Sequence, residues 1–185
     1  MKNEIVKLGI ILLIITAIAA TLLGFVNQIT SPVIEEQIIE ANNIARKSIM
    51  TEADSFELID EDFGPSILEV YKALKGNDVI GFTIKTSPKG YGGDIEVTTG
   101  ITKDGKISGV SLGTMNETPG LGAKAKDAEY INQYTDKPVD NHIAVIKNGT
   151  PSENEIIAIS GATITSVAVT EGINSSVDLF NEKLQ

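Results

Sequence analysis

The chain has 185 residues, a formal net charge of −10 and no cysteine, so it is long enough for one membrane anchor and one domain of ordinary size. The missing cysteine excludes a disulfide framework, cysteine-ligated zinc, iron–sulfur clusters held by this chain and c-type haem attachment. The single histidine, His142, provides at most one ligand for a histidine-based metal site. The acidic balance disfavours nucleic acid as a partner, because no basic patch is present to neutralise phosphates.

The first predicted element is a membrane-spanning helix. Residues 8–26 carry no charge and are rich in Ile, Leu and Ala. At a rise of about 1.5 Å per residue they match a bilayer interior roughly 30 Å thick. A cleaved signal peptide is the alternative interpretation, since Ala17-Ile18-Ala19 resembles a small-x-small cleavage site.

Charges on the two sides of this helix predict its orientation. Lys2 and Lys7 precede it, whereas three glutamates between residues 35 and 40 follow it. Lysine and arginine are retained on the cytoplasmic side of membrane helices. We therefore expect a single-pass protein of the cell membrane with a cytoplasmic N-terminus, and we expect everything after about Asn27 to be extracytoplasmic.

The segment after the anchor predicts a second helix. Ser31-Pro32 is typical of a helix start, with serine as the N-cap and proline at the first helical position. An apolar stripe of helical period follows it, so we expect a helix over residues 32–50. This helix lies in a connecting segment, residues 28–52, between the N-terminus with its anchor (1–27) and an external domain (53–185).

The pattern of the external domain then changes to short runs rich in β-branched residues, separated by turn signals. The runs are residues 67–74, 79–85, 95–101 and 106–112, and the turns are residues 76–77, 88–93 and 103–105. We further expect a helix over residues 121–134 and a strand over residues 142–147 that includes His142. The fold class is therefore α+β, with a single N-terminal transmembrane helix followed by an antiparallel-sheet domain with packed helices.

The most informative motif is Ser160-Gly161-Ala162-Thr163-Ile164-Thr165-Ser166, which precedes a one-faced helical pattern. The apolar positions of that pattern are Val169, Ile173, Val177, Phe180 and Leu184. The motif is therefore expected at a helix N-terminus, where free N–H groups and the helix dipole favour a phosphate. Thr163 could bind this phosphate or be esterified by it. The alternative is that Ser160 or Thr163 simply caps the helix.

Two glycine-rich strings precede this motif. One, Glu117-Thr118-Pro119-Gly120-Leu121-Gly122-Ala123-Lys124, is a tight loop between the last strand of the meander and a helix. Such a loop lets backbone N–H groups or a flat ring come close, although it could equally be a plain connection. The other, residues 89–95, contains Tyr91 between glycines and could equally be a hairpin turn.

In this order, the three motifs resemble the FMN-binding domain of the G subunit of Rnf complexes and of the C subunit of sodium-pumping NADH:quinone oxidoreductases. The resemblance covers about residues 89–183, and the shortness of the chain favours the Rnf family. It implies that FMN is attached through its phosphate to the threonine of Ser-Gly-Ala-Thr, here Thr163, by a flavin transferase that uses FAD. The family pattern usually has an acidic residue three positions before the serine, where this chain has Ile157.

The resemblance also implies roles for the neighbouring residues. Besides Thr163 as the covalent attachment point, the expected phosphate ligands are Ser160, Gly161, Ala162, Thr165 and Lys124, and the last of these could instead contact a flavin carbonyl. The residues expected to border the ring are Glu117, Thr118, Leu121 and Gly122, with Tyr91 or its glycine neighbours on the other side. Thr165 is the competing attachment hydroxyl. No catalytic acid, base or nucleophile and no metal ligand is expected, because the redox chemistry belongs to the cofactor.

The function implied is that of an electron-transfer flavoprotein subunit in an Rnf-type, ion-translocating ferredoxin:NAD oxidoreductase. Since the chain has one span and no metal ligands, its expected partners are the membrane, iron–sulfur and flavin subunits of that complex. Three alternatives stay open: a component of a sodium-pumping NADH:quinone oxidoreductase, a membrane-tethered ligand-binding or sensor domain without redox chemistry, and a pilin-like assembly protein.

Overall fold

The computed structural model describes residues 2–185, without side-chain detail at Lys2, Asn3 and Glu35. It consists of two compact units, Met1–Asn43 and Ile44–Gln185.

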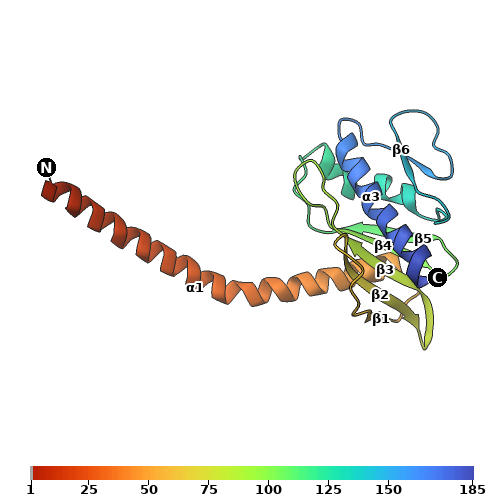
Figure 1. The fold of residues 1–185 in the computed structure, drawn as a ribbon, viewed down its shortest axis with the longest axis horizontal. Helices are drawn as coiled ribbons and strands as arrows, with labels where there is room; N and C mark the ends of the chain where they lie inside the picture. The colour runs from red at the N-terminus through yellow and green to blue at the C-terminus, as the bar shows by residue number, and fades with distance from the viewer. Residues whose placement is uncertain (1) are drawn as a thin grey trace. The chain divides into compact units, whose positions relative to one another are not determined.

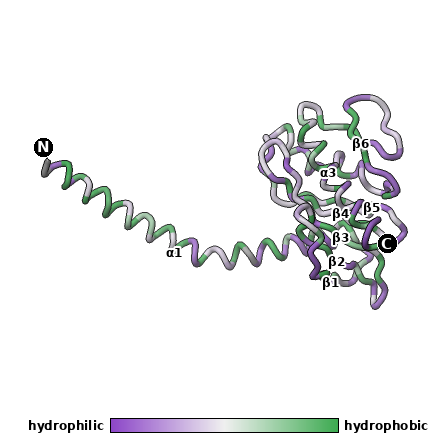
Figure 2. The backbone as a smooth tube through the Cα atoms, in the orientation of Figure 1, coloured by the Kyte–Doolittle hydropathy of each residue, from purple (hydrophilic) through white to green (hydrophobic). Residues whose placement is uncertain are grey.

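The first unit is formed by the helix α1, which spans Lys2–Ile49 and whose final turns belong to the second unit. Figure 2 shows mainly hydrophobic residues along its N-terminal part. This is the one helix in residues 2–185 that is long and apolar enough to cross a membrane. The hydroxyls of Thr16, Thr21 and Thr30 donate to backbone carbonyls one turn earlier, so these polar groups are satisfied within the helix, as a bilayer requires.

The expected helix start at Ser31-Pro32 is wrong, because α1 continues through it with Pro32 in its interior. Proline lacks an N–H and therefore removes one backbone hydrogen bond. The helix tolerates this single loss and ends only at Ile49. A proline inside a long helix is a typical place for a kink rather than an end.

The second unit is built on a five-stranded sheet in the order β1-β2-β3-β4-β5, with every neighbouring pair antiparallel (Figure 1). The strands are β1 (Ser55–Leu58), β2 (Ile67–Lys75), β3 (Asp78–Thr86), β4 (Val97–Thr102) and β5 (Ile107–Leu112). The predicted meander is confirmed, and β1 adds one strand that the sequence pattern did not reveal. Residues 136–138 lie along the outer edge of β5, where Ile107 exchanges hydrogen bonds with Asp136 and Lys137, so this edge is covered.

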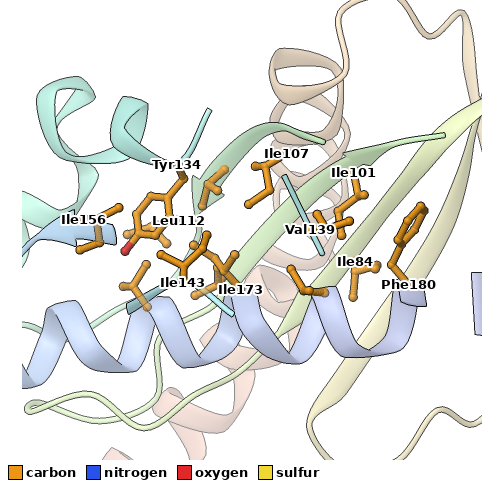
Figure 3. Close-up of a cluster of buried hydrophobic side chains, with 14 of the residues drawn as sticks. Ile84, Ile101, Ile107, Leu112, Tyr134, Val139, Ile143, Ile156, Ile173 and Phe180 are labelled. Atoms are coloured by element: carbon orange, nitrogen blue, oxygen red, sulfur yellow. The ribbon is translucent and has the colours of Figure 1, made fainter. Parts of the chain in front are cut away.

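One face of the sheet packs against α3 (Thr163–Leu179), the helix that follows the Ser160 motif. The predicted apolar stripe is buried: Val169, Ile173, Val177 and Phe180 are each at most 1% exposed. Phe180 makes an edge-to-face contact with Phe82 at 6.1 Å between ring centroids. Figure 3 shows this core between α3 and the strands. The packing therefore fixes α3, and the motif at its start, relative to the sheet.

The other face of the sheet receives the last turn of α1, in the part that belongs to the second unit. Ile49 and Met50 are 7% and 3% exposed. A Cβ at Gly81 would lie 2.7 Å from the terminal methyl of Met50, and a Cβ at Gly109 would lie 3.2 Å from the Cβ of Ile49. Two strand glycines thus make room for this turn. Arg46 adds an ion pair with Glu69 at 2.7 Å.

Between β5 and α3 the chain forms short elements. The helix expected over residues 121–134 is instead three pieces: the 3₁₀ helix η1 (Gly122–Lys126), α2 (Ala128–Ile131) and the 3₁₀ turn η2 (Asn132–Tyr134). Asp127 is extended, with φ −69° and ψ 138°, which interrupts the helical hydrogen bonds between η1 and α2.

A short strand, β6 (Ala144–Ile146), forms within the expected strand of residues 142–147 and pairs in parallel with β7 (Glu155–Ile157), which the sequence pattern did not predict. His142 lies before β6, so its expected place inside a strand is wrong. Its Nε2 lies 2.6 Å from Asp178 Oδ1 on α3. This side-chain contact with a sequence-distant helix is not encoded by local periodicity.

Two buried tyrosines connect η2 and α2 to α3. The hydroxyls of Tyr130 and Tyr134 are 2.8 Å apart, and the Tyr134 hydroxyl lies 2.8 Å from Thr170 Oγ1. Tyr130 also donates to the backbone carbonyl of Ser166 at 3.3 Å. Burial raises the pKa of Tyr130 and raises the pKa of Tyr134 well above 10.0, since the interior disfavours the phenolate.

This raised pKa predicts a loss of stability in alkaline solution. The unfolded chain releases the Tyr134 proton near pH 10 whereas the folded chain retains it, so the free energy of unfolding is unaffected below about pH 10 and falls as pH rises above it. In Tyr134→Phe this fall should be smaller by about 1 kcal/mol between pH 10 and 11. Urea unfolding in detergent at several pH values measures both slopes. If the free energy of unfolding fell equally with pH in the wild type and in Tyr134→Phe, the alkaline loss of stability could not be assigned to Tyr134.

Candidate functional site

The turn that leads into α3 is held by the backbone and by one buried serine. The Ala162 N–H donates to Ile159 O at 2.9 Å, and Gly161 has φ +77°, a left-handed conformation that glycine adopts without a Cβ penalty. Ser166 Oγ accepts the Ile159 N–H at 3.0 Å and donates to Ala162 O at 3.0 Å. Since Ser166 is 0% exposed, these two hydrogen bonds satisfy its hydroxyl and tie the turn to the helix.

The N-cap position of α3 is Ala162, and no side chain caps the helix. The alternative in which Ser160 or Thr163 acts as the cap is therefore wrong. In residues 2–185, the backbone N–H groups of Thr163, Ile164 and Thr165 have no hydrogen-bond acceptor, and the first amide of this turn that is paired is that of Ser166. Unpaired amides at the positive end of a helix dipole form an anion-binding site.

These amides belong to the wall of a cavity of about 580 Å³. That volume is within the range of small-molecule and cofactor sites, roughly 300–1,000 Å³. The three predicted motifs contribute all of the lining residues: Tyr91, Glu117, Thr118, Leu121, Gly122, Gly161, Ala162, Thr163, Ile164 and Thr165. The fold thus brings together residues that are more than seventy positions apart in the sequence.

The two candidate attachment hydroxyls differ in their surroundings. Thr165 is 1% exposed and its Oγ1 donates to Glu117 Oε2 at 2.6 Å. Thr163 is half-buried at the cavity wall, and across the described chain its hydroxyl makes no hydrogen bond. The Thr165 proton is therefore directed away from a ligand, and the backbone N–H is the donor that this residue still offers. Of these two threonines, Thr163 is the one whose hydroxyl is unpaired within residues 2–185.

Ser160 and Lys124, both expected to contact the phosphate, are not among the residues that line the first cavity. They line a second cavity of about 430 Å³ together with Ile157. Ile157 is 36% exposed, and its backbone N–H and carbonyl both bond to the Gln133 side chain, at 2.8 Å and 3.3 Å. The end of β7 is therefore fixed through its backbone, and the Ile157 side chain is left at the surface.

Sequence reasoning missed Ile164, which lines the first cavity and is 58% exposed. The sequence signal that could have revealed Ile164 as a lining residue was its position between Thr163 and Thr165 in the motif. A large apolar side chain left so exposed at a helix start is consistent with a wall that an apolar ligand covers. The pairing of Glu117 with Thr165 was also missed, because the two residues are 48 positions apart.

Comparison with known proteins gives two family matches. Residues 90–178 match the FMN-binding domain family, and residues 1–48 match the RnfG N-terminal region. The first match contains every residue that lines the larger cavity.

Similar proteins cover nearly the whole chain. The G subunit of the Na⁺-translocating ferredoxin:NAD⁺ oxidoreductase complex of Acetobacterium woodii is 41% identical over 94% of this chain and 90% of its own length. The G subunit of the proton-translocating ferredoxin:NAD⁺ oxidoreductase complex of Clostridium ljungdahlii is 35% identical over 96% of this chain and 92% of its own length.

Solved structures share the fold of the domain. The C subunit of the Na⁺-translocating NADH-quinone reductase of Parabacteroides distasonis superposes with a TM-score of 0.54 at 24% identity, over 62% of this chain and 61% of that chain. NqrC of Shewanella oneidensis gives a TM-score of 0.53 at 18% identity, over 70% of this chain and 66% of that chain.

The role of Ser166 in the turn generates a testable prediction. Ser166→Ala leaves the half-buried Ile159 N–H without its acceptor, so the free energy of unfolding should fall by about 1–3 kcal/mol. The matched control is Ser175→Ala on the same helix, where the hydroxyl only bonds to Glu171 O and the change should be about 0.5 kcal/mol or less. Urea unfolding followed by circular dichroism measures both. Equal effects of the two substitutions would show that Ser166 does not hold the turn.

Proposed function

The chain belongs to the G-subunit family of Rnf-type ion-translocating oxidoreductase complexes, and we propose that it is a membrane-anchored flavoprotein that relays electrons within such a complex. Relatives named as G subunits match almost the full chain, whereas the structures of the quinone-reductase C subunits match only part of it and at lower identity. This difference favours an Rnf-type complex over a quinone reductase. The partners are then the other membrane, iron–sulfur and flavin subunits.

The observation that carries the cofactor assignment is the uncapped start of α3 at the wall of the cavity. The free amides of Thr163, Ile164 and Thr165 suit the phosphate of FMN. The apolar side chains of Tyr91, Leu121 and Ile164 at the same cavity suit a flat ring system. The donor set and the volume therefore fit FMN.

We further propose that the attachment is covalent and that Thr163 provides it. A flavin transferase would present FAD, and Thr163 Oγ1 would replace AMP on the phosphorus of the FMN moiety. One P–O bond forms and the pyrophosphate P–O bond breaks, while the hydroxyl proton passes to a base of the transferase. The support for Thr163 over Thr165 is its unpaired hydroxyl at the cavity wall, since Thr165 is buried and bonded to Glu117.

A bound flavin supplies two-electron and one-electron redox chemistry, which this chain does not provide from its own side chains. The contribution of the chain is to hold and orient the ring. The amides at the start of α3 would donate hydrogen bonds to the phosphate, and the glycine-rich loops bring backbone close to the cavity. Electrons would reach and leave the site through partner subunits, because residues 2–185 contain one candidate span and the sequence has no cysteine to bind an iron–sulfur cluster.

The orientation of the anchor is part of the proposal. Lys2 and Lys7 precede the apolar stretch, and acidic residues follow it, so the positive-inside rule assigns the N-terminus to the cytoplasm and the flavin domain to the outside. Electrons from a cytoplasmic donor must then cross the membrane to reach this domain.

Substitution of the attachment residue tests the covalent bond. Thr163→Ala, produced with a competent transferase, should lose flavin fluorescence on a denaturing gel while the free energy of unfolding changes by about 0.5 kcal/mol or less, because the hydroxyl has no partner in the fold. Thr163→Ser keeps a hydroxyl and should keep the fluorescence. Fluorescence that persists in Thr163→Ala but disappears in Thr165→Val would assign the bond to Thr165 instead.

The absence of cysteine from the sequence makes the orientation directly measurable. Single cysteines at Glu4 and at Lys103, in the exposed turn between β4 and β5, should react differently with a membrane-impermeant maleimide on intact cells. We expect labelling of Lys103→Cys and none of Glu4→Cys until the cells are opened. The opposite pattern would place the flavin domain in the cytoplasm.

A further inference from the structure

We infer that Glu117 is a positioning residue that holds two walls of the cavity in place, by tying the glycine-rich loop at residues 88–95 to the first turn of α3. We call the carboxylate of Glu117 with its two partners, Gly92 and Thr165, the latch. The significance of the latch for FMN rests on the proposed function, whereas the latch itself is a property of the fold.

The contacts of Glu117 join three distant parts of the chain. Oε1 accepts the Gly92 N–H at 2.9 Å, and Oε2 accepts the Thr165 hydroxyl at 2.6 Å. Gly92 and Thr165 lie 25 and 48 positions away in the sequence. An ionised carboxylate has only acceptors, so one donor at each oxygen suits its charged form. Glu117 is 7% exposed, and hydrogen bonds to a shielded charged group are stronger than neutral ones.

The glycines around Glu117 explain how a carboxylate fits there. A Cβ at Gly90 would overlap Oε1, and a Cβ at Gly122 would overlap Oε2 and lie 2.6 Å from Thr165 Oγ1. A Cβ at Gly92 would overlap the backbone carbonyl of Asn116. Gly90 and Gly122 therefore leave room for this side chain, and Gly92 leaves room for the backbone that precedes it. Sequence reasoning assigned them to backbone approach toward a ligand.

The loop itself is a small hairpin with Tyr91 at its tip. Gly90 N–H donates to Gly93 O at 2.8 Å, and Ile95 N–H donates to Pro88 O at 2.9 Å. Tyr91 is 71% exposed and lines the cavity. In the described chain, the hydrogen bonds of residues 90–93 are those within the hairpin and the one from Gly92 to Glu117. Loss of the latch therefore frees the tip, and the cavity wall that carries Tyr91, to move.

Glu117 consequently acts through other groups rather than by contacting the phosphate. Its position ties the wall that carries Tyr91 to the amides at the start of α3, so the opening between them is fixed before a ligand arrives. A pre-formed opening lowers the entropic cost of ordering the ring and its phosphate together.

Limited proteolysis tests the latch without a flavin. Lys89 is exposed, and trypsin cleaves the Lys89–Gly90 bond only when the hairpin opens, at a rate that follows the open population. In the full chain in detergent, produced without the transferase, Glu117→Ala should be cleaved there about tenfold faster or more than the wild type, as expected for a lost hydrogen bond to a charged group.

Two conservative variants separate the latch from general destabilisation. Glu117→Gln keeps an oxygen for the Gly92 N–H and offers an N–H₂ to Thr165 Oγ1, so its cleavage rate should stay within about twofold of the wild type. Thr165→Val removes one donor and should raise the rate about threefold or more. The matched control is Glu155→Ala, which removes a carboxylate that accepts the Ser152 N–H in another loop and should leave the rate unchanged.

Flavin-loaded protein provides a second readout. Iodide should quench the attached flavin more strongly in Glu117→Ala than in Glu117→Gln, while both keep the flavin on Thr163. Wild-type cleavage rates in both Glu117→Ala and Thr165→Val would overturn the latch. If the variants change the cleavage rate as expected but the wild-type chain never acquires flavin, the latch stands and the proposed function is overturned. Failure of the latch and failure of the proposed function are therefore distinguishable.

Discussion

Three backbone N–H groups at the start of α3 lack acceptors within residues 2–185, because Ala162 occupies the N-cap position and has no side-chain oxygen to offer them. A serine or threonine cap would stabilise the helix by about 1 kcal/mol, so this turn forgoes stability that a single hydroxyl would supply. The omission leaves donors and the positive end of the helix dipole available to an anion. The cavity, the open Thr163 hydroxyl and the exposed apolar wall all lie around this one uncapped turn.

The other hydroxyls of the motif stabilise the turn that keeps these donors open. Ser166 ties Ile159 to Ala162, and Thr165 binds Glu117. Behind them, Tyr130 donates to Ser166 O, and the core between α3 and the sheet holds the helix (Figure 3). Within one short motif, Thr163 therefore keeps an unpaired hydroxyl at the cavity wall in residues 2–185, whereas the buried Thr165 and Ser166 hold the turn through hydrogen bonds. Membership in the Rnf G-subunit family agrees with this division, since the FMN-binding domain match of residues 90–178 includes both groups.

The local sequence pattern predicted those elements whose formation depends on residues close together in the sequence. The meander strands and the stripe of α3 follow from periodicity, and the start of α3 follows from the small-residue turn. The sequence pattern did not predict the structure where contacts between sequence-distant residues determine it. Ser31-Pro32 has the residues of a helix start, yet α1 continues through it. His142 meets Asp178, Lys124 and Ser160 line a separate cavity, and Glu117 bonds Thr165. A short stretch of sequence cannot reveal these contacts, because each depends on how the sheet and α3 pack.

If a flavin phosphate is joined to Thr163, the unpaired hydroxyl of the motif that lines the cavity, tandem mass spectrometry detects the added mass at that residue. Trypsin releases residues 148–183 as one peptide, which contains Thr163 and Thr165. In protein made with the transferase, we expect this peptide to be heavier by FMN less water, with fragment ions that place the added mass on Thr163. Added mass on Thr165, or a peptide of unmodified mass, would contradict the account.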